Sequence, residues 1–447
     1  MEAHDMDIIP DEQTLWARQQ RYLVPAVMPY YQEPLDLTHG RGLELYDRDN
    51  RRYLDFFGGI LTVSIGHAHP DVVHAVEDQV HQLSHTSTLY VTKPMVDLAE
   101  RLAALTPGDL EQSFFTSSGS EANETAVTMA QLATGASEVL ALRHSYSGRS
   151  ALAMNLTGQA SWRLGLSGLP GIRHAHNAYC YRCPFGKKPE TCGLECAQDL
   201  NELIATETSG HIGAFIAEPI QGVGGFITPP DTYFQEASDI VRRHGALFID
   251  DEVQTGFGRT GKMFGIEHSG VVPDIMTFAK GLANGLPIGA TITSKTIASK
   301  YQGPTISTFG GNPISMRAAL ATLTVIEREN LMLNAQVMGE RLRDGLELLQ
   351  EEFPFIGDVR GKGLMQGLEF VRDDKEPAPD LVLRFFEGTK VRGLLLGRGG
   401  LRGNIVRIAP ALTVTKSHIT EALDTMREAL TELVQQDPEL ALLQRTH

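Results

Sequence analysis

The centre of this 447-residue chain repeats one pattern, in which a short β-branched or aromatic run is followed by a Gly-, Ser- or Asp-rich turn and then by helical periodicity. Strands that alternate with helices in this way form parallel sheets, because each helix carries the chain back across the sheet. The sequence therefore predicts an α/β fold built on a parallel sheet. The candidate strands are 113–116, 138–142, 213–217, 246–250, 275–278 and 289–293.

The pattern changes after Asn312-Pro313. Residues 313–350 have helical spacing, and a second set of short strands and a terminal helix follow. We expect an N-terminal segment over 1–64 that packs with the small domain, a large domain over 65–329, and a small C-terminal domain over 330–447.

Charge and hydropathy limit the partners of the chain. Its formal net charge is −16, whereas nucleic acids and anionic membranes bind clustered Lys and Arg. No stretch of about 18 uninterrupted apolar residues is present, so we expect no membrane span. The first ten residues are acidic, unlike a secretory signal, and we expect a cytoplasmic protein whose partners are small metabolites.

A lysine, Lys280, ends the apolar run 275–279. Burial lowers the pKa of a lysine, and the resulting neutral amine condenses with aldehydes to form a Schiff base. Acidic residues follow the preceding strand at 250–252, and such residues are also common in ordinary turns. Together with Lys280 they favour a site, because an ionised carboxylate can hold a pyridine nitrogen protonated.

A Ser- and Gly-rich turn leads from the first strand into a helix at 116–130. Ser118 and Glu121 have the spacing of a capping box, and the free N–H groups of a first helical turn bind phosphate. A plain capped helix explains the same residues, so this motif is weak by itself.

Taken together, these motifs resemble the class III pyridoxal-phosphate (PLP) aminotransferases of fold type I over essentially the whole chain. The resemblance implies a large domain with a mostly parallel seven-stranded sheet flanked by helices, and a smaller α+β domain. Within the class, segments 357–369 and 393–399 are most similar to the alanine–glyoxylate aminotransferase 2, 3-aminoisobutyrate–pyruvate and ω-transaminase group. The matching blocks are 66–70, 115–124, 146–148, 217–222, 251–261, 273–289, 308–313 and 407–410.

The resemblance also implies residue roles around the cofactor PLP. Lys280 is the catalytic residue, which binds the cofactor aldehyde and moves the substrate proton. Asp251 pairs with the pyridine nitrogen, Gln254 bonds the ring hydroxyl, and Tyr146 stacks on the ring. The remaining cofactor-binding residues hold or surround the phosphate and the ring; they are Ser118, Gly119, Ser120, Glu218 and Thr308.

Three further implications concern the substrate and the assembly. Arg407 matches the arginine that binds the substrate carboxylate, although a structural arginine would look the same in sequence. Thr308 matches the threonine that reaches the phosphate of a neighbouring subunit. The resemblance thus implies a homodimer, or a dimer of such dimers, with the active site at the subunit interface and no metal in it.

Two positions depart from the family pattern. Ornithine-type members carry a glutamate that pairs with the substrate-binding arginine, and this chain has Val223 there. The departure favours amines and ω- or β-amino acids as donors, with pyruvate or glyoxylate as acceptor. At Ser147 many members have histidine, and we attach no consequence to that difference.

Four cysteines lie in one segment, with the spacing Cys180-x2-Cys183-x8-Cys192-x3-Cys196. A structural zinc site, local disulfides and free thiols all remain open. The glycine-rich segments 361–367 and 397–403 lack dinucleotide-binding spacing, so loops are expected there, with Arg398 and Arg402 as candidates for the substrate entrance.

These features predict a PLP-dependent transaminase that moves an amino group from an amine, an ω- or β-amino acid or alanine to a keto acid. A phospho-lyase acting on an amino-alcohol phosphate is an alternative on the same scaffold. A non-catalytic protein that keeps the fold is a third possibility, although it would have no need of Lys280, Asp251, Gln254 and Arg407 together.

Overall fold

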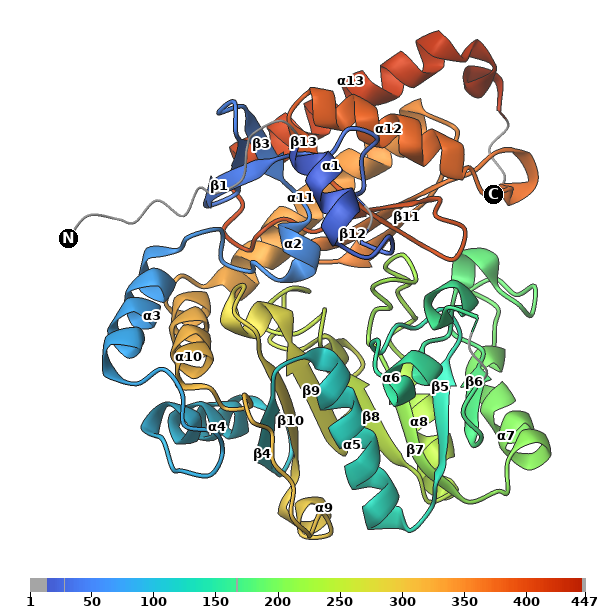
Figure 1. The fold of residues 1–447 in the computed structure, drawn as a ribbon. Coiled ribbons are helices and arrows are strands. Elements are labelled where there is room, and N and C mark those ends of the chain that lie inside the picture. Colours follow the sequence, from blue (N-terminus) through green and yellow to red (C-terminus); the bar gives the residue numbers. More distant parts are fainter. Residues whose placement is uncertain (1–13, 28, 166–167, 444–447) are drawn as a thin grey trace.

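The computed structural model of the chain describes residues 14–27, 29–165 and 168–443. A seven-stranded sheet forms its centre, with the strand order β4-β10-β9-β8-β7-β5-β6 (Figure 1). All six expected strands are present, and β6 is an additional strand. The seven strands are β4 (Leu110–Thr116), β5 (Glu138–Leu142), β6 (Ile172–Ala175), β7 (Ile212–Ala217), β8 (Leu247–Asp251), β9 (Ile275–Ala279) and β10 (Gly289–Ser294).

The sheet is mostly parallel, as expected. Strands β9, β8, β7, β5 and β6 pair in parallel, whereas β10 is antiparallel to both β9 and β4. The connection 280–288 explains the exception, because it is shorter than the dozen or so residues that a parallel crossover needs.

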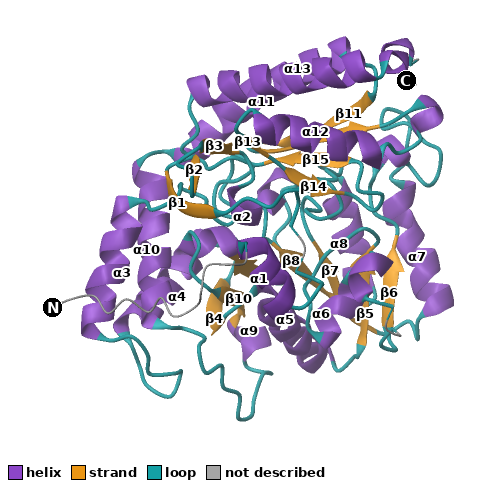
Figure 2. Ribbon diagram, turned by 45° about the horizontal axis from the view of Figure 1, so that its top comes forward, coloured by secondary structure: helices purple, strands orange, loops and turns teal. Residues whose placement is uncertain are grey.

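Helices cover both faces of this sheet. Helix α5 packs on β7, β9 and β10, while α8 packs on β7 and β8 from behind in Figure 1. Helices α4, α5 and α9 contact β4, and Figure 2 shows the strands enclosed by helices. The helices of this part are α3 (Pro70–Gln82), α4 (Lys93–Leu105), α5 (Gly119–Thr134), α6 (Ala151–Leu156), α7 (Glu195–Glu207), α8 (Tyr233–Arg243), α9 (Lys295–Ala298) and α10 (Pro313–Arg328).

Two four-stranded sheets lie above the main sheet in Figure 1. One has the order β11-β12-β15-β14, from β11 (Ile356–Lys362), β12 (Met365–Phe370), β15 (Ile405–Ile408) and β14 (Gly397–Gly399). The other has the order β1-β2-β3-β13, from β1 (Leu37–Arg41), β2 (Glu44–Asp47), β3 (Arg52–Asp55) and β13 (Leu394–Leu395). The pairing of β3 with β13 joins the N-terminal segment to the C-terminal region. The domain bounds themselves stay a prediction.

The helical stretch expected over 313–350 is two helices. Asn330 adopts a left-handed conformation with φ of 52°, which ends the run between α10 and the next helix. The remaining helices are α1 (Leu15–Tyr22), α2 (Gly58–Leu61), α11 (Leu331–Glu352), α12 (Pro379–Val391) and α13 (Lys416–Gln436). None of the described helices has both the length and the apolar character that crossing a membrane requires.

Candidate active site

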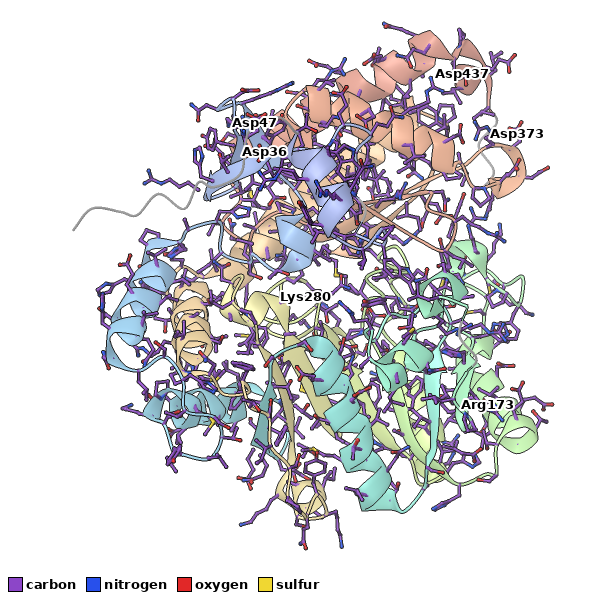
Figure 3. All side chains as sticks on the ribbon, viewed as in Figure 1. Asp36, Asp47, Arg173, Lys280, Asp373 and Asp437 are labelled. Atoms are coloured by element: carbon purple, nitrogen blue, oxygen red, sulfur yellow. The ribbon has the colours of Figure 1, made fainter. Side chains whose placement is uncertain are left out.

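The main sheet brings three of the expected site residues to one edge. Glu218 follows β7, Asp251 is the last residue of β8, and Lys280 follows β9. These strands are parallel neighbours, so their carboxyl ends meet, which is where open α/β sheets bind ligands. Lys280 lies at this edge, facing the C-terminal region (Figure 3).

Lys280 occupies a strained and partly buried position. Its φ is 43°, a left-handed conformation that costs free energy for any residue other than glycine and is often found at functional sites. Burial lowers the pKa of its amine, Asp251 and Glu218 oppose this, and Arg407 adds to it. A larger share of Lys280 is therefore neutral and nucleophilic near pH 7 than for an exposed lysine.

The Asp251 carboxylate is buried and held from two sides. Its Oδ2 accepts a 2.7 Å hydrogen bond from Asn123 Nδ2, and its Oδ1 accepts one of 3.1 Å from the Val253 N–H. Burial raises the pKa of Asp251 to about 6, and the two hydrogen bonds and Lys280 keep it from rising further. The group is therefore mostly ionised at neutral pH.

Asn123 is a site residue that the sequence analysis missed. It lies on α5, and it also contacts the segment that bears Tyr146, because its Nδ2 donates to the Ser147 carbonyl at 2.9 Å. The available signal was an asparagine inside a helix, a position that asparagine disfavours.

Glu218 organises the loop that carries the aromatic residue Tyr146. Its Oε1 accepts from the Tyr146 N–H at 3.0 Å, and its Oε2 accepts from the Gly222 N–H at 2.8 Å. Burial and the Asp251 charge raise the pKa of Glu218 to about 8. The Tyr146 ring meets Trp162 edge-on, with 5.3 Å between the ring centroids.

Gln254 has an unsatisfied polar atom. The side chain is buried, and its Oε1 has no hydrogen-bond partner among the described residues. A buried amide oxygen without a partner is costly, so such an atom calls for a donor from a ligand. A ring hydroxyl group would supply one.

The N-terminus of α5 forms the expected cap. Ser118 Oγ accepts from the Glu121 N–H at 3.3 Å and donates to the Glu121 carboxylate at 3.0 Å. The first helical N–H groups, at Gly119 and Ser120, have no partner within the helix and can bind an anion. A Cβ on Gly148 would lie 2.3 Å from Ser120 Oγ, so glycine is required there.

Arg407, on β15, is a buried cation without a carboxylate partner. Its guanidinium donates to the Arg398 carbonyl at 3.0 Å and to the Gly222 carbonyl at 3.4 Å, and lies over the Phe57 ring at 4.7 Å. No described Asp or Glu forms an ion pair with it. Val223 stands where ornithine-type members have the pairing glutamate, which agrees with this, and Arg398 contacts Arg407 through its backbone carbonyl.

Thr308 is apart from the other site residues. It is exposed in the segment between α9 and α10, beside the exposed apolar side chains Ile306 and Phe309. No hydrogen bond of the described residues joins Thr308 to the edge of the sheet that bears Lys280. Its role stays a prediction, because the resemblance assigns it to the site of a second subunit.

The two acidic residues beside Asp251, Asp250 and Glu252, are buried. Glu252 Oε1 accepts from the Ile266 N–H at 2.8 Å, and burial raises the pKa of Glu252 to about 7. Burial and the charge of Glu252 raise the pKa of Asp250 well above its usual range. Among the described residues, the carboxylate of Asp251 is the one in this acidic run that bonds the Asn123 side chain.

The cysteine segment contains four free thiols. They line one cavity of about 20 Å³ together, but no group of three His, Cys, Asp or Glu in the described chain is arranged to hold a metal ion. The zinc alternative therefore has no geometric support. Burial raises the pKa of Cys180 to about 11 and that of Cys196 to about 12, so both thiols are protonated and weakly reactive.

Comparison with known proteins identifies the class of the enzyme. The model of the family described as Aminotransferase class-III matches residues 27–430. The chain therefore belongs to the class-III aminotransferases, which are PLP-dependent enzymes.

Within the family, the chain is similar to alanine–glyoxylate aminotransferase 2 homolog 2 of Arabidopsis thaliana, at 43% identity over 93% of this chain and 87% of the relative. This similarity confirms the subgroup that the motifs indicated. Among solved structures, a Bacillus anthracis aminotransferase has a TM-score of 0.88 at 32% identity, covering 94% of this chain and 98% of that one.

Two more solved structures bear on the function. A PLP-bound amine transaminase from an uncultivated Pseudomonas species has a TM-score of 0.86 at 32% identity, covering 92% and 98% of the two chains. A phospholyase from Arthrobacter in complex with phosphoethanolamine has a TM-score of 0.86 at 31% identity, covering 94% of this chain and 99% of that one.

Proposed function

We propose that this aminotransferase moves an amino group from an amine, an ω- or β-amino acid or alanine to a small keto acid such as pyruvate or glyoxylate. Arg407 carries this proposal. It is a buried guanidinium, close enough to Lys280 to affect the pKa of that amine, and it has no anionic partner among the described residues. A substrate carboxylate supplies the missing charge, and a planar guanidinium binds it with two hydrogen bonds.

The residues around Lys280 fit PLP. The unpartnered Gln254 oxygen suits the ring hydroxyl group, the Asp251 carboxylate suits the pyridine nitrogen, and the first turn of α5 from Gly119 and Ser120 suits the phosphate. We assign ring stacking to Tyr146, the cap of the phosphate site to Ser118, and support of the Tyr146 loop to Glu218.

PLP, when bound, withdraws electrons from the substrate carbon that bears the amino group. Lys280 Nζ would take up the proton from that carbon and hold it within the site, since its lowered pKa leaves a neutral amine to act as base. The ionised Asp251 carboxylate would keep the pyridine nitrogen protonated. Arg407 fixes the substrate carboxylate so that the reacting carbon faces Nζ.

We also propose a homodimer in which Thr308 of each subunit reaches the phosphate site of the other. The exposed apolar side chains of Ile306 and Phe309, beside Thr308, support this assembly, because apolar patches on a protein surface mark interaction sites. Free thiols and an acidic composition support a cytoplasmic location.

A donor screen tests the proposed reaction. The protein loaded with PLP is mixed with simple amines, β-amino acids, ω-amino acids and alanine, with pyruvate or glyoxylate as acceptor, and the aminated acceptor is quantified. We expect product only when a keto acid is present. Release of inorganic phosphate from phosphoethanolamine without a keto acid would instead support the phospho-lyase alternative, which the Arthrobacter structure favours.

Replacing Arg407 tests the substrate carboxylate site. We expect Arg407→Lys to raise the KM for pyruvate about 10- to 100-fold, because a hydrogen bond to a charged group contributes about 1.5–3 kcal/mol and the planar pair is lost. Initial rates at varied pyruvate concentration measure the change. Arg243→Lys, at an exposed position on α8, is the matched control. An unchanged KM in Arg407→Lys would contradict the assignment.

A further inference from the structure

Asn123 connects three separate elements around the site. Its side chain is buried on α5, and its Oδ1 accepts a 2.7 Å hydrogen bond from Thr277 Oγ1 on β9. Its Nδ2 donates to Asp251 Oδ2 on β8 at 2.7 Å and to the Ser147 carbonyl at 2.9 Å. One amide therefore links the carboxylate, the loop with Tyr146 and the strand that leads to Lys280.

The orientation of this amide is fixed by its neighbours. Asp251 Oδ2 and the Ser147 carbonyl are both acceptors, so the amide nitrogen must face them and the amide oxygen must face Thr277. A flipped amide would place three oxygens together. Both donor hydrogens of the amide nitrogen are used, and the amide oxygen already accepts a hydrogen bond, so Asn123 has no donor left for a ligand.

Asp251 needs the donor that Asn123 provides. Burial of its carboxyl group disfavours the ionised form, and the neighbouring carboxyl groups of Asp250 and Glu218 interact electrostatically with it. On the other side are the Lys280 amine and the Val253 N–H. Of the two hydrogen bonds to Asp251, the bond from Asn123 is the shorter and comes from a side chain, so a substitution can remove it.

We propose that Asn123 is a positioning residue that keeps Asp251 ionised and holds it in register with the Tyr146 loop, and so sets the pH range over which the protein retains PLP. This inference rests on the proposed function of Asp251. It assigns Asn123 no contact with cofactor or substrate.

The test is the dissociation constant of PLP from the apoprotein, measured by equilibrium dialysis between pH 5.5 and 8.5. In the wild type, affinity falls as pH drops through the pKa of Asp251, because the carboxyl group becomes protonated. We expect Asn123→Leu to move the midpoint of this fall upward by about one to two pH units, since the lost hydrogen bond favoured the ionised form. Thr277→Val leaves Asn123 in place but removes one of its hydrogen bonds, so we expect a smaller upward shift of the same midpoint.

Thr291→Val is the matched control. Thr291 is equally buried and donates to α5 at the Ala122 carbonyl, but it has no bond to Asn123 or Asp251. We expect its midpoint to equal that of the wild type. In an Asp251→Asn background, Asn123→Leu should leave the pH profile unchanged, because the titrating group is gone.

A uniform loss of PLP affinity at every pH in Asn123→Leu would overturn the inference and indicate a purely structural role. If Asn123→Leu does not fold, Thr277→Val serves as the test. An unshifted midpoint in that variant would also overturn the inference. If the wild-type apoprotein does not bind PLP, the proposed function fails. If the wild type binds it and Asp251→Asn loses the pH dependence while Asn123→Leu keeps the wild-type midpoint, only the inference about Asn123 fails.

Discussion

Turnover falls about 10⁴-fold when Lys280 is replaced by methionine, because the variant loses the only amine assigned to remove the substrate proton. Methionine keeps an unbranched side chain of similar length, so the packing changes little. The lowered pKa of Lys280 shows that the folded protein disfavours the charged amine. Removing the amine should therefore leave the unfolding temperature of the apoprotein unchanged or slightly higher.

The measurement is kcat for the donor and acceptor that the screen identifies. Borohydride reduction followed by intact-protein mass spectrometry checks whether Nζ forms the covalent bond to the cofactor aldehyde. We expect a mass increase in the wild type and none in Lys280→Met. Lys295→Met, which alters an exposed lysine at the start of α9, is the control for a general effect of removing a lysine. Normal turnover in Lys280→Met would refute the assignment of Lys280 as base.

The main sheet could be predicted because its strands carry strong local signals. Buried central strands such as β7 and β9 read as continuous apolar runs, which parallel sheets require on both faces. Strand β6 was missed because it is a polar edge strand, Ile172–Ala175, with only its last residue buried. The reversed direction of β10 depends on the length of a connection, which periodicity does not record.

The site was predictable where a residue lies at the end of a strand. Lys280 and Asp251 each follow an apolar run, so their sequence positions indicate their place in the sheet. Asn123 lies on a helix and meets Asp251 across 128 positions of sequence, a contact that no local pattern encodes. Arg407 became informative only when its buried guanidinium was seen to lack an ion pair among the described residues.

In the cysteine segment, the sequence indicated a possible site that the fold does not form. Its spacing is typical of a zinc site, and the fold does gather the four cysteines around one cavity. However, sequence spacing defines only how far the chain can reach, whereas metal binding depends on where the sulfur atoms lie relative to a common point. The described structure contains no metal-holding group there.

Asp251→Asn is expected to weaken PLP binding by more than about 100-fold, because a neutral amide cannot balance a protonated pyridine nitrogen and loss of one partner of a buried charge pair costs about 3–5 kcal/mol. The side chains have nearly the same shape, and the Val253 N–H bond to the oxygen can remain. Equilibrium dialysis of PLP against the apoprotein at pH 7.5 measures the loss. Asp239→Asn, at an exposed position on α8, should bind PLP as the wild type does.

The same substitution should not destabilise the apoprotein. The pH dependence of the free energy of unfolding tests the reason. The folded-state pKa of Asp251 is about 6, above the ordinary value near 4 for an unfolded chain. The folded protein therefore binds this proton more tightly, and its stability falls as pH rises between about 4 and 6. Asp251→Asn lacks this penalty, so its free energy of unfolding relative to the wild type should increase by on the order of 1 kcal/mol between pH 5 and pH 8. Urea unfolding at both values measures the difference, and a larger relative stability at pH 5 would contradict the buried, ionised state from which the role of Asp251 follows.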